Sequence, residues 1–124
     1  MKRQQLGAWG ENLALRHLQG LGYLILTQNW RSSEGEIDLV ALDGETLVFI
    51  EVKTRSSKSF GWPEESITAA KRLRLQRVAW SYLDAHDLKD ADWRVDVFAI
   101  ETTSSGGVEQ LEHFINAVEG DGAV

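Results

Sequence analysis

The sequence predicts an α/β domain in which a central mixed β-sheet is flanked by helices, with the element order α-β-β-β-α-β-β. Two stretches, residues 4–21 and 65–86, carry apolar side chains at helical spacing, and five shorter apolar stretches have the length of strands. A helix between strands of one sheet is typical of this class. Because 124 residues suffice for one core and not for two, we expect one domain, residues 1–124.

The first helix is expected over residues 4–21, because its apolar residues share one face: Leu6, Trp9, Leu13 and Ala14. Glycines at positions 20 and 22 end it, as is common at helix C-termini. A first strand follows over residues 23–28. Residues 29–35 are polar and are expected to form a connection rather than a strand.

A β-hairpin comes next, with strands over residues 36–42 and 46–53. Asp43-Gly44 between them is a strong hairpin signal. Two registers remain open. A two-residue turn at 43–44 makes Asp38 and Glu51 diagonal neighbours, whereas a four-residue loop puts them directly opposite each other.

A serine- and lysine-rich loop is expected over residues 55–62, followed by Pro63 and a second helix over residues 65–86. The apolar residues of this helix are Leu75, Val78, Ala79, Tyr82 and Leu83. Residues 93–101 read as a buried strand and residues 108–115 as an edge strand. The end, residues 119–124, is expected to be a frayed tail.

The composition is that of an ordinary globular protein, with 43% apolar and 26% charged residues and no cysteine. The absence of cysteine excludes disulfides and thiolate metal sites. The basic start of the chain is not followed by an apolar run of signal-peptide or membrane-span length, so a cytoplasmic protein is expected.

The net charge of −6 argues against nucleic acid as a partner, but the charge is unevenly distributed. Residues 49–80 carry seven basic and three acidic side chains, so this segment is positive. Candidate phosphate contacts in it are Arg55 and, along one side of the second helix, Lys71, Arg74 and Arg77. The alternative is an ordinary solvent-exposed helix face. Leu73 and Trp80 lie off the main apolar arc and indicate either a partner surface or a second packing layer.

The most informative pattern places Asp38, Glu51 and Lys53 among strand residues that otherwise read as buried. Side chains alternate along a strand, so both hairpin registers put these three on one face. Two facing carboxylates repel each other unless a cation lies between them. Mg²⁺ (or Mn²⁺) is suited to this place, since it takes one or two carboxylates and keeps several waters. Lys53 could stabilise charge on a phosphate, which indicates metal-assisted phosphodiester hydrolysis.

The alternative for these three residues is a salt bridge on a half-exposed sheet face. Glu11 lies at the edge of the apolar face of the first helix, where a carboxylate can point into a cleft. Its alternative is a solvated acid near a helix N-terminus. The three histidines show no metal-ligand spacing, and no phosphate-binding glycine loop is present.

Several motifs together resemble the uncharacterised bacterial YraN-type family. They are Gly10-Glu11, GEIDLVA at residues 35–41, FIEVKTR at 49–55, FGWPEESI at 60–67, RVDV at 94–97 and Asn116-Ala117. That family is similar to restriction-endonuclease-like nucleases, especially archaeal Holliday-junction resolvases. The resemblance implies that Asp38 and Glu51 bind metal, that Lys53 is the catalytic lysine, and that Glu11 is the acid supplied by the first helix. It also implies a homodimer that binds DNA.

The function expected from these observations is a Mg²⁺-dependent nuclease acting on DNA, including branched or structured DNA. The alternative is a non-catalytic nucleic-acid-binding or protein-adaptor module that keeps the nuclease fold.

Overall fold

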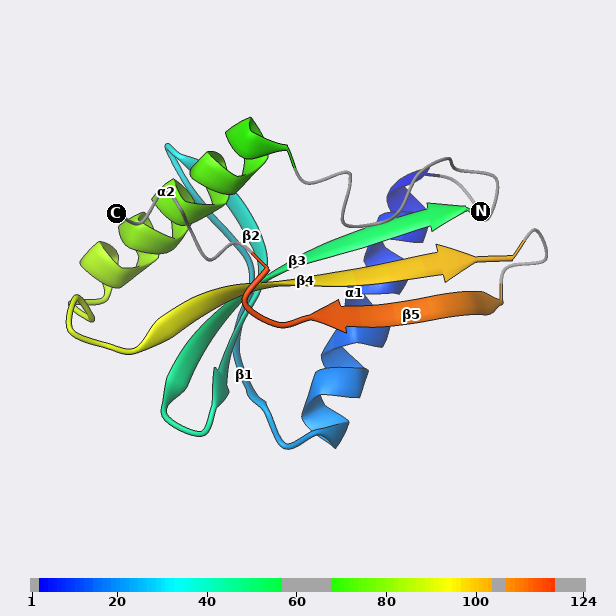
Figure 1. Cartoon of the computed structure of the whole chain (residues 1–124), viewed down its shortest axis with the longest axis horizontal. Coiled ribbons are helices and arrows are strands. Elements are labelled where there is room, and N and C mark those ends of the chain that lie inside the picture. Colours follow the sequence, from blue (N-terminus) through cyan, green and yellow to red (C-terminus); the bar gives the residue numbers. More distant parts are fainter. Residues whose placement is uncertain (1–2, 57–67, 104–106, 118–124) are drawn as a thin grey trace.

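Five strands form one mixed sheet in the order β1-β2-β3-β4-β5 (Figure 1). The computed structural model describes residues 3–56, 68–103 and 107–117. Its elements are α1 (Arg3–Gly20), β1 (Leu24–Ser32), β2 (Gly35–Asp43), β3 (Thr46–Ser56), α2 (Ala69–Ala85), β4 (Trp93–Thr102) and β5 (Val108–Phe114). β3 and β4 are parallel, and the other neighbours are antiparallel. The predicted class and element order are confirmed, and they are consistent with a nuclease-like fold.

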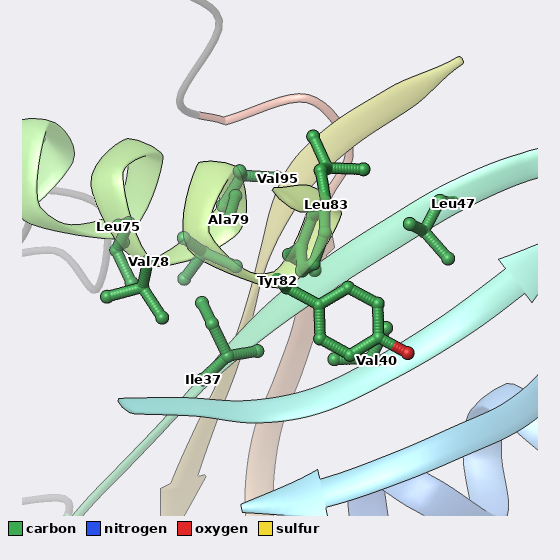
Figure 2. Packing of buried hydrophobic residues seen from close by; sticks show 11 residues of the cluster. Ile37, Val40, Leu47, Leu75, Val78, Ala79, Tyr82, Leu83 and Val95 are labelled. Carbon is green, nitrogen blue, oxygen red and sulfur yellow. The ribbon is translucent and has the colours of Figure 1, made fainter. Parts of the chain in front are cut away.

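Two hydrophobic cores lie on opposite faces of the sheet. On one face, Ala14 and Leu18 of α1 pack on the sheet together with Leu39, Ile50 and Phe98. On the other, the α2 residues expected to be buried are buried against the sheet: Leu75, Val78, Ala79, Tyr82 and Leu83. Figure 2 shows this second core, in which the α2 side chains meet those of β2 and β3. The sheet is therefore the middle of three layers.

β1 is longer than predicted, and it is irregular. It continues through the expected connection to Ser32, which pairs with Gly35 across a tight turn. The register shifts between Ile25 and Thr27, and Asn29 has a left-handed φ of +52°. Polar composition was a poor guide here, because Trp30 on this extension packs into the core beside α2.

The hairpin turn lies one residue later than the Asp43-Gly44 signal suggested. Asp43 pairs with Thr46 and Leu42 with Leu47, so Gly44, with a φ of +62°, and Glu45 form the turn. β3 then continues to Ser56, so residues 55 and 56, expected in a loop, belong to the strand; the rest of the expected loop, residues 57–62, lies outside the described residues.

α2 begins at Ala69, later than the predicted residue 65, because Thr68 is an extended N-cap whose hydroxyl accepts the Lys71 backbone N–H at 3.1 Å. The motif at residues 60–67, Pro63 and the expected frayed tail lie outside the described residues. None of the described helices has the length and apolarity needed to span a membrane.

Candidate metal and phosphate site

The candidate site lies where β2 and β3 separate. Their ladder ends at the pair Leu39 and Ile50, so the next positions in the same register are Asp38 and Glu51. In this register the two acids lie opposite each other. It is the register expected for a four-residue loop between Leu42 and Leu47, within which Asp43 and Thr46 form one more pair. Beyond this point the Val52 N–H is not bonded to β2 backbone but donates to the Asp38 carboxylate at 2.7 Å. At this fork, where β2 and β3 diverge, the Asp38 carboxylate accepts the hydrogen bond that a backbone carbonyl of β2 would accept in a regular ladder.

Asp38 is a buried acid, with 8% of its surface exposed. Burial raises the pKa of its carboxyl group to about 9, helped by the hydrogen bond with Glu51, by the charge of Glu51 and by that of Glu11. The Val52 N–H opposes this increase in pKa. The Asp38 carboxyl group is therefore protonated at neutral pH, as one acid of a close carboxyl pair is when no cation separates the two.

Glu11 joins this pair from α1. Burial raises the pKa of the Glu11 carboxyl, the charges of Glu36 and Glu51 raise it further, and a hydrogen bond from Asn29 lowers it. α1 can approach β3 closely because residue 10 is a glycine that packs on Thr54. A Cβ at position 10 would overlap the Thr54 hydroxyl. The Glu11 side chain that the resemblance assigned to the site is thus within electrostatic range of Glu51.

Asn29 is a site residue that the sequence analysis missed. Its neighbours pair regularly, Gln28 with Leu39 and Trp30 with Ile37, which puts Asn29 at the level of Asp38. Its backbone is left-handed within the continuous strand, and its side chain bonds to Glu11. Asparagine tolerates this backbone better than most residues, which is the one signal that could have drawn attention to it.

Two lysines complete the site. Lys71, in the first turn of α2, places its Nζ 3.4 Å from Glu51 Oε2, and only 16% and 15% of the two side chains are exposed. The pKa of Lys53 is lowered by the adjacent Lys71 ammonium and by burial, while Glu51 opposes this decrease. Lys53 therefore lies next to Glu51, as expected. Lys71, expected on a phosphate-binding helix face, lies in the site instead.

The other three predicted phosphate contacts do not lie in this cluster of acids and lysines. Arg55 is close to it, because its charge contributes to the lowered pKa of Lys53, but its guanidinium pairs with Glu101 at 3.3 Å. Arg74 and Arg77 are exposed on α2. Arg77 lines an open hollow together with Trp80, which is 52% exposed. Two of the four predicted cations are therefore on the surface and two are largely covered.

The carboxylate oxygens of the site suit a hard divalent cation that needs few ligands from the protein. Within residues 3–56, 68–103 and 107–117, no three or more histidine, aspartate or glutamate side chains are close enough to enclose an ion. Mg²⁺ does not need such a cage, because it binds through one or two carboxylates and keeps its waters. Asp38 and Glu51 fit this requirement, since they are two neighbouring oxygen donors, and Asp38 keeps its proton in the absence of a cation.

A second polar cluster surrounds Asp96 on β4, on the same face as α1. Asp96 is fully buried and accepts hydrogen bonds from Arg94 at 3.0 Å, from the Asn116 backbone at 2.8 Å and from His113 at 2.7 Å. These donors lower the pKa of the Asp96 carboxyl despite its burial. These hydrogen bonds connect β5 and the residues after it to β4. The RVDV segment and the Asn116-Ala117 segment, two motifs far apart in the sequence, are therefore in direct contact.

Comparison with known proteins agrees with the resemblance seen in the sequence. Residues 10–100 match the profile described as Uncharacterised protein family UPF0102. The chain belongs to this family. A UPF0102 protein of Beutenbergia cavernae is 47% identical over 90% of this chain and 93% of its own length. One from Roseiflexus castenholzii is 45% identical over 95% and 96%, and one from Desulfitobacterium hafniense 47% identical over 85% and 88%.

The match covers the residues that form the site, from Glu11 to Lys71. The family description and the names of these relatives state no activity. Any function must therefore be argued from the chemistry of the site.

Proposed function

We propose that the protein is a Mg²⁺-dependent nuclease that hydrolyses phosphodiester bonds in branched or structured DNA. The observation that carries this proposal is the carboxyl pair of Asp38 and Glu51 at the fork of β2 and β3, with Lys53 beside it. Two facing carboxyl groups, one of which otherwise keeps its proton, are a favourable place for a cation.

Asp38 and Glu51 would hold the cation through carboxylate oxygens. When bound, Mg²⁺ polarises a phosphate oxygen and makes a coordinated water more acidic. Lys53 supplies an ammonium group that stabilises the negative charge developing on the phosphate. Glu11, held by the Asn29 side chain, accepts a proton or a hydrogen bond from the attacking water.

DNA as the substrate is supported by the resemblance to resolvases and by the exposed Arg74 and Arg77 on α2, the helix that carries Lys71. A phosphate chain that enters the site at Lys71 can continue along this helix face. We propose a cytoplasmic location, as expected from the sequence, and the resemblance favours a homodimer, which would present two sites to the arms of a junction. Sedimentation of the protein, alone and with a four-way junction, tests that assembly.

Purified protein with Mg²⁺ or Mn²⁺ should cut a panel consisting of a four-way junction, a flap, a duplex, a single strand and an RNA. Asp38→Asn and Glu51→Gln should each lower the cleavage rate by about 100-fold or more, because each removes a charged ligand. Asp90→Asn, an exposed acid outside the site, is the matched control. Cleavage that survives in both site variants would refute the assignment.

A non-catalytic adaptor is the second candidate, and the exposed Leu73 and Trp80 on α2 favour it. An adaptor has no need for a cation at its acids, whereas the nuclease requires one. Titration with Mn²⁺ separates the two functions: binding that depends on Asp38 supports the nuclease, and no binding supports the adaptor.

A further inference from the structure

Lys71 reaches the acids from α2, whereas Glu11, Asn29 and the residues of the hairpin come from α1, β1, β2 and β3. The first turn of α2 is anchored by Thr68, whose hydroxyl accepts the Lys71 N–H and whose carbonyl accepts the Arg72 N–H at 2.9 Å. The Lys71 backbone is therefore held in place, while its four-carbon side chain extends over β3 to Glu51. A flexible side chain on a fixed anchor can move its ammonium group by several ångströms.

The arrangement around Glu51 is not one that stability alone would favour. Two ammonium groups, those of Lys53 and Lys71, lie beside one carboxylate, and all three side chains are largely removed from water. A buried ion pair gains little over apolar packing, and a second like charge makes the cluster less favourable still. Clusters of this kind are enriched at functional sites.

We propose that Lys71 is a further catalytic residue, whose ammonium group pairs with Glu51 in the cation-free protein and moves to a non-bridging oxygen of the scissile phosphate once Glu51 binds a cation. This inference rests on the proposed nuclease function. It gives the two lysines separate tasks: Lys53 stabilises the charge developing on the phosphate from β3, and Lys71 contacts a non-bridging oxygen of that phosphate from α2.

The proposal predicts that Lys71 competes with the cation for Glu51. Removing the ammonium group frees the carboxylate, so Lys71→Ala and Lys71→Gln should bind Mn²⁺ about three- to tenfold more tightly than the wild type. The same variants should lose phosphate contacts. Tighter cation binding with weaker substrate binding is a combination that a purely structural lysine does not produce.

The experiment combines calorimetric Mn²⁺ titration without DNA and anisotropy of a labelled four-way junction. With Ca²⁺, used to permit binding, Lys71→Gln should bind the junction about tenfold more weakly than the wild type. With EDTA the two should bind equally, because Lys71 is then engaged by Glu51. Arg72→Ala, next in the chain and exposed, is the control that should change neither Mn²⁺ affinity nor the calcium dependence.

Unchanged or weaker Mn²⁺ binding by both Lys71 variants, with melting temperatures near that of the wild type, would overturn the proposal and make Lys71 a structural anchor of α2. Equal loss of junction binding with Ca²⁺ and with EDTA would also overturn it. A wild type that binds Mn²⁺ and the junction but cuts nothing counts against the nuclease alone. The two binding measurements still decide the competition and the phosphate contact.

Discussion

Replacing Asp38 by asparagine should change how the stability of the cation-free protein depends on pH. The asparagine is an uncharged copy of the protonated acid: its carbonyl can accept the Val52 N–H, and its amide can donate to Glu51. The variant therefore keeps the hydrogen bonds of the site and removes only the titrating proton.

The expected magnitude follows from the pKa of Asp38, which rises from 3.8 in the unfolded chain to about 9 in the folded protein. Between these values the folded state holds a proton that the unfolded state has released. Stability is thus fully present below the lower pKa and is lost as the pH rises toward the higher one, by about 1.4 kcal/mol per pH unit. From about pH 5 to about pH 8 the loss is about 4 kcal/mol, a large share of a typical domain stability.

Urea unfolding at several pH values between these limits, with EDTA present, measures the effect. At the acidic limit wild type and Asp38→Asn should have similar free energies of unfolding. Toward the alkaline limit the variant should be the more stable by several kcal/mol, because its site has nothing left to deprotonate. Asp90→Asn, at an exposed position, should follow the wild type throughout.

Mg²⁺ should act as a substitute for the proton. At a concentration 100 times its dissociation constant the cation should stabilise the wild type by about 2.7 kcal/mol and flatten its pH dependence, with little effect on Asp38→Asn. The reasoning is refuted if the difference in stability between variant and wild type does not change with pH. Asp38 would then be ionised in the cation-free protein.

Three further predictions concern the surroundings of the site. Gly10→Ala should destabilise the protein by about 1–3 kcal/mol in urea unfolding, because its Cβ overlaps Thr54. Gly7→Ala, with open space around it, should leave the free energy of unfolding unchanged or raise it by up to about 1 kcal/mol, and equal effects of the two substitutions would contradict the close contact of α1 with β3. Asp96→Asn should cost about 3–5 kcal/mol in the same assay, because Arg94 would lose its buried counter-charge, and a variant as stable as Asp90→Asn would show that the charge is dispensable. Asn29→Gly keeps the left-handed backbone and removes the amide that holds Glu11, so stability should change by less than about 1 kcal/mol while cleavage slows about tenfold; undiminished cleavage would count against this role.

The acid pair could be predicted from the sequence because it depends on local structure alone. Asp38 and Glu51 lie on adjacent strands of one hairpin, where side-chain alternation and a short turn determine which residues face each other. The uncertainty of the turn did not matter, since both registers put the acids on one face. The two helices were predictable for a similar reason: the buried residues of α2 follow a helical repeat.

Lys71 and Asn29 could not be assigned in this way. The position of Lys71 beside Glu51 depends on how α2 packs across β3, which no local pattern contains. Asn29 belongs to a polar segment that reads as a loop, yet the segment pairs with β2 on both sides of it. In both cases tertiary packing decides the outcome, and propensity is only a weak guide to it.

The irregular backbone of β1 also has a consequence for how copies of the protein behave in a crowded solution. Within the described part of the chain, β1 is an outer strand of the sheet, and its Leu24 and Leu26 are 61% and 42% exposed. An outer strand with exposed leucines is a template for unwanted pairing with another chain. The register shift and the left-handed Asn29 make this outer strand irregular and so disfavour such pairing, as bulges at sheet edges do. The residue that holds Glu11 thus also protects the sheet against aggregation.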